Sequence, residues 1–148
     1  MKAVLQRVTR AQVTIDGTLH SRIGPGLMIL LGIKTGDTEQ DAVSLAEKCA
    51  SLRIFDDENG KMNLSVRDVG GSMLIISQFT LYGDARKGNR PSFADAAVPS
   101  EAEPLYEKFA AHARTLLGGD RIATGVFRAA MDVELVNNGP VTITVESK

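Results

Sequence analysis

The sequence predicts an α/β protein in which roughly seven strands form a largely β body of two sheets, with two main helices packed on one side. Its 148 residues fit a single domain, 1–148, and leave no room for a second of ordinary size. Apolar residues make up 43% of the chain, which is enough to bury a core. Strand patterns outnumber helical patterns by too many for a doubly wound sheet.

The strand patterns occupy both ends and the middle of the chain. From Lys2 to Asp16, β-branched residues are interleaved with polar ones, and a turn is expected at Asp16-Gly17. The continuous apolar run Leu27–Ile33 is typical of a central strand. Further strands are expected over Met73–Tyr82 and near 122–127, 131–136 and 141–146, the last with Val141, Ile143 and Val145 facing inward.

Two helices are predicted from capping residues followed by apolar residues at helical spacing. The first begins after Thr38, whose capping box is weakened because Asp41 takes the place of Glu or Gln, and it buries Ala42, Leu45, Ala46, Cys49 and Leu52. The second has a full capping box in Ser100 and Glu103 and ends at Gly118-Gly119. Its apolar stripe consists of Leu105, Phe109, Ala113 and Leu116.

Charge and cysteine content exclude several classes of protein. Lys and Arg total 17 against 18 Asp and Glu, so a protein that coats nucleic acid by bulk charge is excluded. The single cysteine, Cys49, excludes a disulfide framework and a cysteine-based zinc cluster, and we expect it in the core. The longest aliphatic run, Leu27–Leu31, is too short to span a bilayer. No signal-peptide core is present, and we expect a reduced, cytosolic protein.

Common catalytic and cofactor motifs are incomplete. Gly83–Gly88 has the glycine spacing of a phosphate-binding loop, but Asn89-Arg90 replaces the Lys and Ser or Thr that should follow. The two histidines, His20 and His112, accompany no nucleophile motif. The acidic cluster Asp56–Glu58 is expected to be solvated surface. We therefore expect no metal and no cofactor.

Two segments carry polar or turn residues where a binding site could form. Ser77–Leu81 leaves a buried apolar strand and enters a loop, and loops at strand ends commonly carry function. As a strand, it would place Gln78 and Thr80 on one face, with Ser77 and Phe79 on the other. Asn138–Thr142 contains a Gly-Pro pair, whose peptide bond can be cis at little cost. Each segment alone is explained by β-propensity or by a turn.

Taken together and with several other stretches, these segments resemble the D-aminoacyl-tRNA deacylases. The other stretches are Leu5–Val8, Arg53–Phe55, Gly60–Leu64 and Arg90–Phe93, in order and at the family's spacing from Met1 to about Val145. The resemblance implies a homodimeric hydrolase that cleaves the ester between a D-amino acid, or mischarged glycine, and the 3′-terminal adenosine of tRNA. Such an enzyme proofreads chirality in translation.

The resemblance also assigns roles to individual residues. Thr80 matches the family's catalytic-position threonine, and Ser77, Gln78 and Phe79 lie beside it. The other subunit would contribute Gly139 and Pro140 as a cis Gly-Pro chirality filter, which Arg7 props through main-chain carbonyls. The family's F-x-A-x-M stretch near the adenosine pocket corresponds to Phe127, Ala129 and Met131.

Two residues depart from the family pattern. Arg128 stands where Gly or Ala is usual, and Asn138 where Asp is common. On a strand, Arg128 would point away from Phe127, so we expect a surface or RNA-contacting charge. The loop Asp84–Arg90, with three basic residues against one aspartate, is expected to contact phosphate beside Thr80.

An aminoacyl ester is already activated and has a neighbouring 2′-hydroxyl, so the protein need only position water and stabilise an oxyanion. The main-chain N–H groups around Phe79 and Thr80 are candidates for the second task. The Thr80 hydroxyl has no base to activate it, and we assign it to hydrogen bonding. The cis Gly139-Pro140 wall would accept hydrogen bonds from the substrate ammonium and exclude an L side chain.

Two alternatives stay open. One is a non-catalytic module that binds an RNA 3′ end. The other is a related deacylase with a trans Gly-Pro bond that acts on mischarged L-aminoacyl-tRNA, although Ser77 favours the D-specific branch. The expected partners are aminoacyl-tRNA and a second copy of the chain, and neither a membrane nor DNA is expected.

Overall fold

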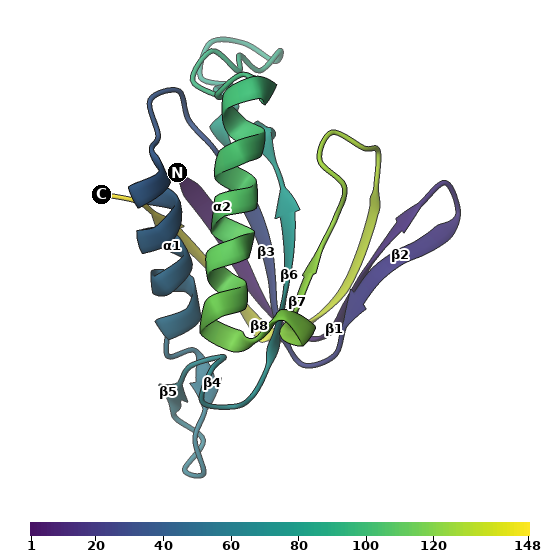
Figure 1. The fold of residues 1–148 in the computed structure, drawn as a ribbon, viewed down its shortest axis with the longest axis vertical. Coiled ribbons are helices and arrows are strands. Elements are labelled where there is room, and N and C mark those ends of the chain that lie inside the picture. Colours follow the sequence, from purple (N-terminus) through teal and green to yellow (C-terminus); the bar gives the residue numbers. More distant parts are fainter.

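The computed structural model describes residues 1–148 and confirms the predicted fold class, with eight strands and two α-helices. Six strands form one sheet in the order β2-β1-β3-β6-β7, with β8 paired to β1, and β4 and β5 form a second sheet. Figure 1 shows α1 and α2 side by side on one face of the large sheet. The strands are β1 (Lys2–Ile15), β2 (Thr18–Ile23), β3 (Gly26–Gly32), β4 (Phe55–Asp56), β5 (Met62–Leu64), β6 (Ser72–Ser77), β7 (Ile122–Thr124) and β8 (Asp132–Glu146).

The apolar run predicted as a central strand is β3, which lies between β1 and β6 and is covered on both faces. Leu27, Ile29 and Leu31 face the helices and belong to the main core of 24 buried residues. Met28 faces the other side, in a smaller cluster of seven buried residues. Period-two alternation thus places one strand in two apolar layers. No helix is long and apolar enough to cross a membrane.

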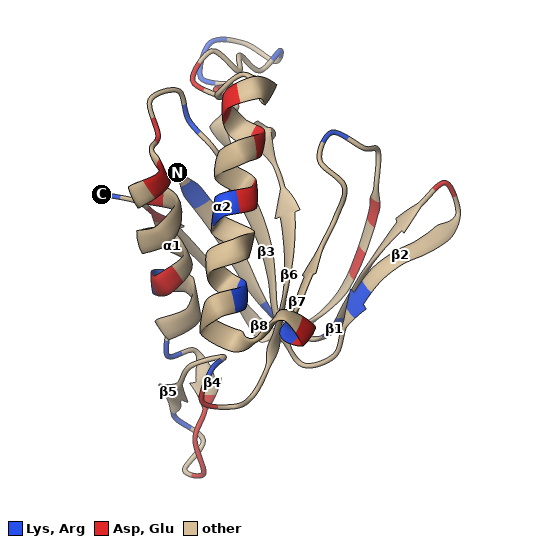
Figure 2. Cartoon of the chain, in the orientation of Figure 1, with Lys and Arg blue, Asp and Glu red and all other residues tan.

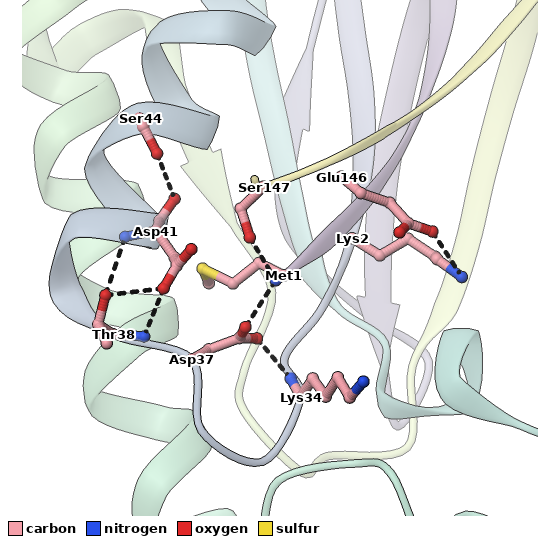
Figure 3. A network of polar contacts seen from close by, with 9 residues as sticks. All are labelled: Met1, Lys2, Lys34, Asp37, Thr38, Asp41, Ser44, Glu146 and Ser147. Carbon is pink, nitrogen blue, oxygen red and sulfur yellow. Dashed lines mark hydrogen bonds and ion pairs between the residues drawn. The ribbon is translucent and has the colours of Figure 1, made fainter.

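Helix α1 (Glu39–Ser51) begins after Thr38, as predicted. The Asp41 N–H donates to Thr38 Oγ1 over 3.3 Å, and the Thr38 N–H donates to Asp41 Oδ2 over 2.8 Å, so both halves of the capping box form (Figure 3). In the same view, the Met1 ammonium donates to Asp37 Oδ1 and to Ser147 Oγ. The start of β1 and the end of β8 are therefore tied to the loop before α1.

The capping box predicted for the second helix is wrong. Helix α2 (Pro99–Leu117) begins one residue before Ser100, with Val98 as N-cap and no side-chain cap. The physical reason is Pro99, whose fixed φ suits the first helical position and which has no N–H to be capped there. The predicted end is confirmed, because Gly118 adopts a φ of 101° at the C-cap.

The strands expected near 131–136 and 141–146 are the two halves of one strand, β8. Both halves pair with the long β1, and the register shifts so that residues 138–141 lie opposite Arg7 alone. This bulge reverses which face odd-numbered residues present. Val133 and Leu135 pack against the smaller cluster, whereas Val141, Ile143 and Val145 pack against the main core, as predicted for these three.

Candidate active site

Three neighbouring strands of the large sheet end at one apolar pocket. β3, β6 and β7 are parallel to one another, so their carboxyl ends lie at the same edge. Ile33 follows β3, Ser77 ends β6, and Phe127 follows β7, and all three line the pocket. Helix α2 closes one side through Pro99 and Ala102. Ligands of open α/β sheets commonly bind at this edge.

The pocket has a volume of about 630 Å³, within the range of small-ligand sites. Twelve of its sixteen lining residues are apolar, and Arg128 is the only charged one. Six predicted site residues line it: Ser77, Gln78, Phe79, Phe127, Ala129 and Met131. The wall from Ala96 to Ala102 was not predicted, and Pro99 at the helix start is the one sequence signal that points to it. Phe93, which also lines the pocket, was predicted only as part of a stretch that resembles the family.

The strand predicted over Met73–Tyr82 is too long. β6 ends at Ser77, and residues Phe79–Tyr82 form a 3₁₀ turn, η1. The alternation of faces expected for residues 77–80 therefore does not occur. Instead, the Gln78 side-chain amide donates to the Thr80 hydroxyl oxygen. Thr80 does not line the pocket itself but is held next to it through this contact.

The pocket mouth is aromatic and exposed. Phe79 is 55% exposed and meets Phe93 edge to face, with 5.1 Å between ring centroids. Val98, which also lines the pocket, is 55% exposed as well. Apolar side chains that gather at the mouth of a pocket are typical of a surface that binds a ligand or a partner.

A buried tyrosine of α2 holds two segments that lie beside the pocket. The Tyr106 hydroxyl donates to the Ile75 carbonyl over 2.8 Å, and its ring lies 5.9 Å from that of Phe127. Burial raises the pKa of Tyr106 to about 12, so the hydroxyl keeps its proton at neutral pH. One side chain thus fixes the end of β6 and the turn that carries Phe127.

Arg128 lies in a turn, and its predicted position on a strand is wrong. β7 ends at Thr124, and the Ala129 N–H donates to the Val126 carbonyl over 3.1 Å. Arg128 occupies the third position of this turn with a φ of 66°, and both it and Phe127 line the pocket. Because the left-handed region favours glycine, the geometry explains why glycine is suited to this position.

Replacing Arg128 by glycine is expected to raise the free energy of unfolding by about 1 kcal/mol, because it removes the cost of a left-handed conformation. Arg128→Ala is the matched control, since it removes the charge but keeps a Cβ. Urea denaturation at equal protein concentration measures both. A glycine variant no more stable than the alanine variant would contradict this account of the turn.

The remaining predicted residues, Arg7, Gly139 and Pro140, form a second group that does not line the pocket of the same chain. Arg7 is only 8% exposed. Its Nε donates to the Asn138 carbonyl and its Nη1 to the Ile54 carbonyl, each over 2.9 Å. Asn138 takes part through its main-chain carbonyl, so the contact is the same whether Asn or the Asp common in the family stands here. The Gly139-Pro140 bond is cis, as expected.

The basic loop beside η1 is partly neutralised. Arg86 and Asp84 form an ion pair at 2.7 Å, and the hydrogen bonds from Arg86 lower the pKa of Asp84 to about 2. Lys87 and Arg90 form no ion pair, and both are exposed. They are therefore the cations of this loop that are available to a ligand.

Other groups considered from the sequence lie outside the pocket. Cys49 is buried in the main core, as predicted, and burial raises the pKa of its thiol to about 12. His112 contacts Glu47 on the helical face over 3.1 Å. No three His, Cys, Asp or Glu side chains gather where they could hold a metal ion.

Comparison with known proteins defines the class. The family model described as D-Tyr-tRNA(Tyr) deacylase matches residues 4–146, so the chain belongs to that family and is a hydrolase. The D-aminoacyl-tRNA deacylase of Halalkalibacterium halodurans is 60% identical over 148 residues, which cover 100% of both chains. That of Anaeromyxobacter dehalogenans is 57% identical and covers 100% of this chain and 98% of its own.

Two solved structures have the same fold. The c-Myc DNA Unwinding Element Binding Protein superimposes with a TM-score of 0.95 at 44% identity, covering 100% of this chain and 99% of its own. A structure described as a probable eukaryotic D-amino acid tRNA deacylase superimposes with a TM-score of 0.83, covering 98% of both chains. At 17% identity, the second likeness concerns the fold alone.

Proposed function

We propose that this protein hydrolyses the ester bond between a D-amino acid and the 3′-terminal adenosine of tRNA. One observation carries the proposal beyond family membership: no Asp, Glu, His, Cys or Lys lines the pocket. Such a site suits an ester that is already activated and that needs positioning rather than acid–base groups. Because aminoacyl-tRNA is consumed in translation, we place the activity in the cytoplasm.

The pocket walls have the chemistry to receive a terminal adenosine. RNA-binding proteins stack unpaired bases on aromatic rings, and Phe79, Phe93 and Phe127 border this cavity. Lys87 and Arg90, in the loop after η1, are placed to approach the phosphates that precede the adenosine. We assign the base to the apolar cavity and the ester to its η1 side.

The chemical step then depends on η1 and on the substrate. The first N–H groups of a helical turn have no partner within it, so those of Phe79 and Thr80 can donate to the developing oxyanion. Water attacks the ester carbonyl, and the C–O bond to the ribose breaks. The ribose 2′-hydroxyl assists proton transfer, because the Thr80 hydroxyl has no base beside it. The Gln78 amide donates to the Thr80 hydroxyl oxygen and so leaves the Thr80 O–H free to point toward the reacting carbonyl.

We further propose that the site is completed by a second copy of the chain. Two features support this. Gly139 and Pro140 are exposed and lie outside the pocket of their own chain. The pocket mouth presents Phe79 and Val98 as an uncovered apolar rim. In the dimer, main-chain carbonyls of the partner's bulge accept hydrogen bonds from the substrate ammonium and block an L side chain, but not the hydrogen of glycine.

Replacing Thr80 by alanine is expected to lower kcat/KM for D-tyrosyl-tRNA about 10- to 100-fold, the loss of one hydrogen bond near developing charge. Thr80→Ser keeps the hydroxyl and should retain most activity. Because Thr80 is exposed, both variants should unfold within about 0.5 kcal/mol of the parent. An alanine variant as active as the parent would remove Thr80 from the mechanism.

The direct test of the function is the release of tyrosine from D- and L-tyrosyl-tRNA, with glycyl-tRNA as a third substrate. We expect the D and glycyl esters to be hydrolysed and the L ester to be left intact. Hydrolysis of the L ester would assign the protein to the other branch of deacylases. Binding of all three without turnover would make it an RNA 3′-end-binding module.

A further inference from the structure

A second cleft lies at the other end of the helices from the pocket. It has a volume of about 500 Å³ and forms where α1 and α2 end, between Ser51 and the pair Leu116-Leu117. Arg53, Arg67 and Arg121 line it, together with a single acidic residue, Asp68. Figure 2 shows basic positions around the lower ends of the two helices.

The three guanidinium groups are not used for internal ion pairs. None of the seven ion pairs of the protein includes Arg53, Arg67 or Arg121. The Arg53 Nε–H donates to the Asn63 carbonyl over 3.0 Å, and the other N–H groups of Arg53 have no protein partner. Arg67 and Arg121 form no side-chain hydrogen bond. Arginine that is neither paired nor buried is well suited to bind phosphate through two N–H groups at once.

The one carboxylate of the cleft is already occupied. Asp68 Oδ2 accepts from both the N–H and the hydroxyl of Ser65, each over 2.8 Å. These bonds lower the pKa of Asp68, and the nearby charges of Arg67 and Arg53 lower it further. The cleft therefore holds three cations against one anion whose Oδ2 is held by Ser65, which favours an anionic ligand.

The cleft lies too far from the pocket for its anionic ligand to be the aminoacyl end of the substrate. Pro99 borders the pocket and Leu117 borders the cleft, so the 19 residues of α2 separate them. At 1.5 Å per residue, this helix is roughly 27 Å long. A terminal aminoacyl-adenosine in the pocket cannot reach the cleft of the same chain, whereas the body of a large RNA can.

We propose that the cleft formed by Arg53, Arg67 and Arg121 binds backbone phosphates of the tRNA body, separately from the site that cleaves the ester. This proposal rests on the proposed deacylase function. It accounts for how a chain with a net charge of −1 holds a polyanion, since the positive charge is gathered locally. The contact contributes to substrate binding and not to the chemical step.

The test compares Arg67→Gln/Arg121→Gln with Arg10→Gln/Arg22→Gln, which removes the same charge from exposed positions on β1 and β2. For D-tyrosyl-tRNA, the cleft variant should raise KM about tenfold at unchanged kcat, and the slope of log(kcat/KM) against log[salt] should fall by about two. With D-tyrosyl-adenosine, which has no tRNA body, both variants should match the parent.

Each other outcome has a defined meaning. An unchanged KM for tRNA, or an equal rise in both double variants, would overturn the proposal. Slower hydrolysis of D-tyrosyl-adenosine by the cleft variant would overturn it as well, by linking the cleft to catalysis. Inorganic phosphate that binds the cleft in calorimetry without any change in the KM for tRNA would assign the site to a free anion instead. If the parent cleaves neither substrate, it is the proposed function that fails.

Discussion

Replacing Arg7 by methionine is expected to lower the free energy of unfolding by about 3 kcal/mol, because the buried Ile54 carbonyl and the part-buried Asn138 carbonyl lose their only side-chain donor. Methionine keeps the length and the apolar stem, so most of the loss reports the guanidinium. The stability of Arg7→Lys should lie between those of the parent and of Arg7→Met, since an ammonium group cannot reproduce the planar fork that reaches both Asn138 and Ile54. Urea denaturation at fixed protein concentration gives the values.

The control lies three residues along the same strand. Arg10 pairs with Glu134 over 3.6 Å, and both side chains are more than half exposed. Arg10→Met should therefore change stability by no more than about 0.5 kcal/mol. A similar loss at both positions would mean that the strand responds to any lost arginine, and the special role given to Arg7 would be wrong.

Replacing Gly139 by alanine is expected to reduce D-aminoacyl-tRNA hydrolysis about 100-fold, because a displacement of the proposed Gly139-Pro140 filter by about 1 Å is enough for such a loss. Gly139 has a φ of 140°, and a Cβ there would lie 2.8 Å from Val141 Cγ2 and 3.2 Å from Arg7 Nη2. The Val141 side chain or the main chain of the bulge would have to shift to admit it. Gly17→Ala also places a Cβ at a positive φ, of 75°, but meets no neighbour within 4 Å, and it should keep full activity.

The same variant tests whether two chains share one site. When Gly139→Ala and Thr80→Ala subunits are co-expressed, each mixed dimer has one site with both changes and one with neither. About a quarter of parental activity should then return, since half of the dimers are mixed and each has one intact site. Activity that stays at the level of the separate variants would place Thr80 and Gly139 of one chain in the same site.

Local patterns predicted those parts of the fold in which one short-range signal dominates. The apolar run at β3 and the Thr38–Asp41 box of α1 are of this kind, and both are confirmed. Errors arose where two signals competed. Pro99 started α2 ahead of the Ser100 cap, and η1 ended β6 although residues 79–82 have good strand propensity.

The candidate site was only partly accessible to such reasoning. The residues of η1 and of the turn after β7 are about 50 positions apart, and parallel pairing of β7 with β6 brings them to one pocket. Without the family resemblance, nothing in the sequence links Asn138 to Arg7, because their contact depends on a register shift between β1 and β8. The arginine cleft likewise joins residues from three separate segments.

The hydrogen bonds of Arg7 to Asn138 and Ile54 end on main-chain oxygens. Every amino acid supplies such an oxygen, so substitutions at positions 54 and 138 leave the acceptors in place. Position 7 has no such freedom, because no other side chain offers the same planar set of donors. Mutational tolerance within this contact is therefore unequal: the donor depends on the identity of residue 7, whereas both acceptors persist whichever residues stand at positions 54 and 138.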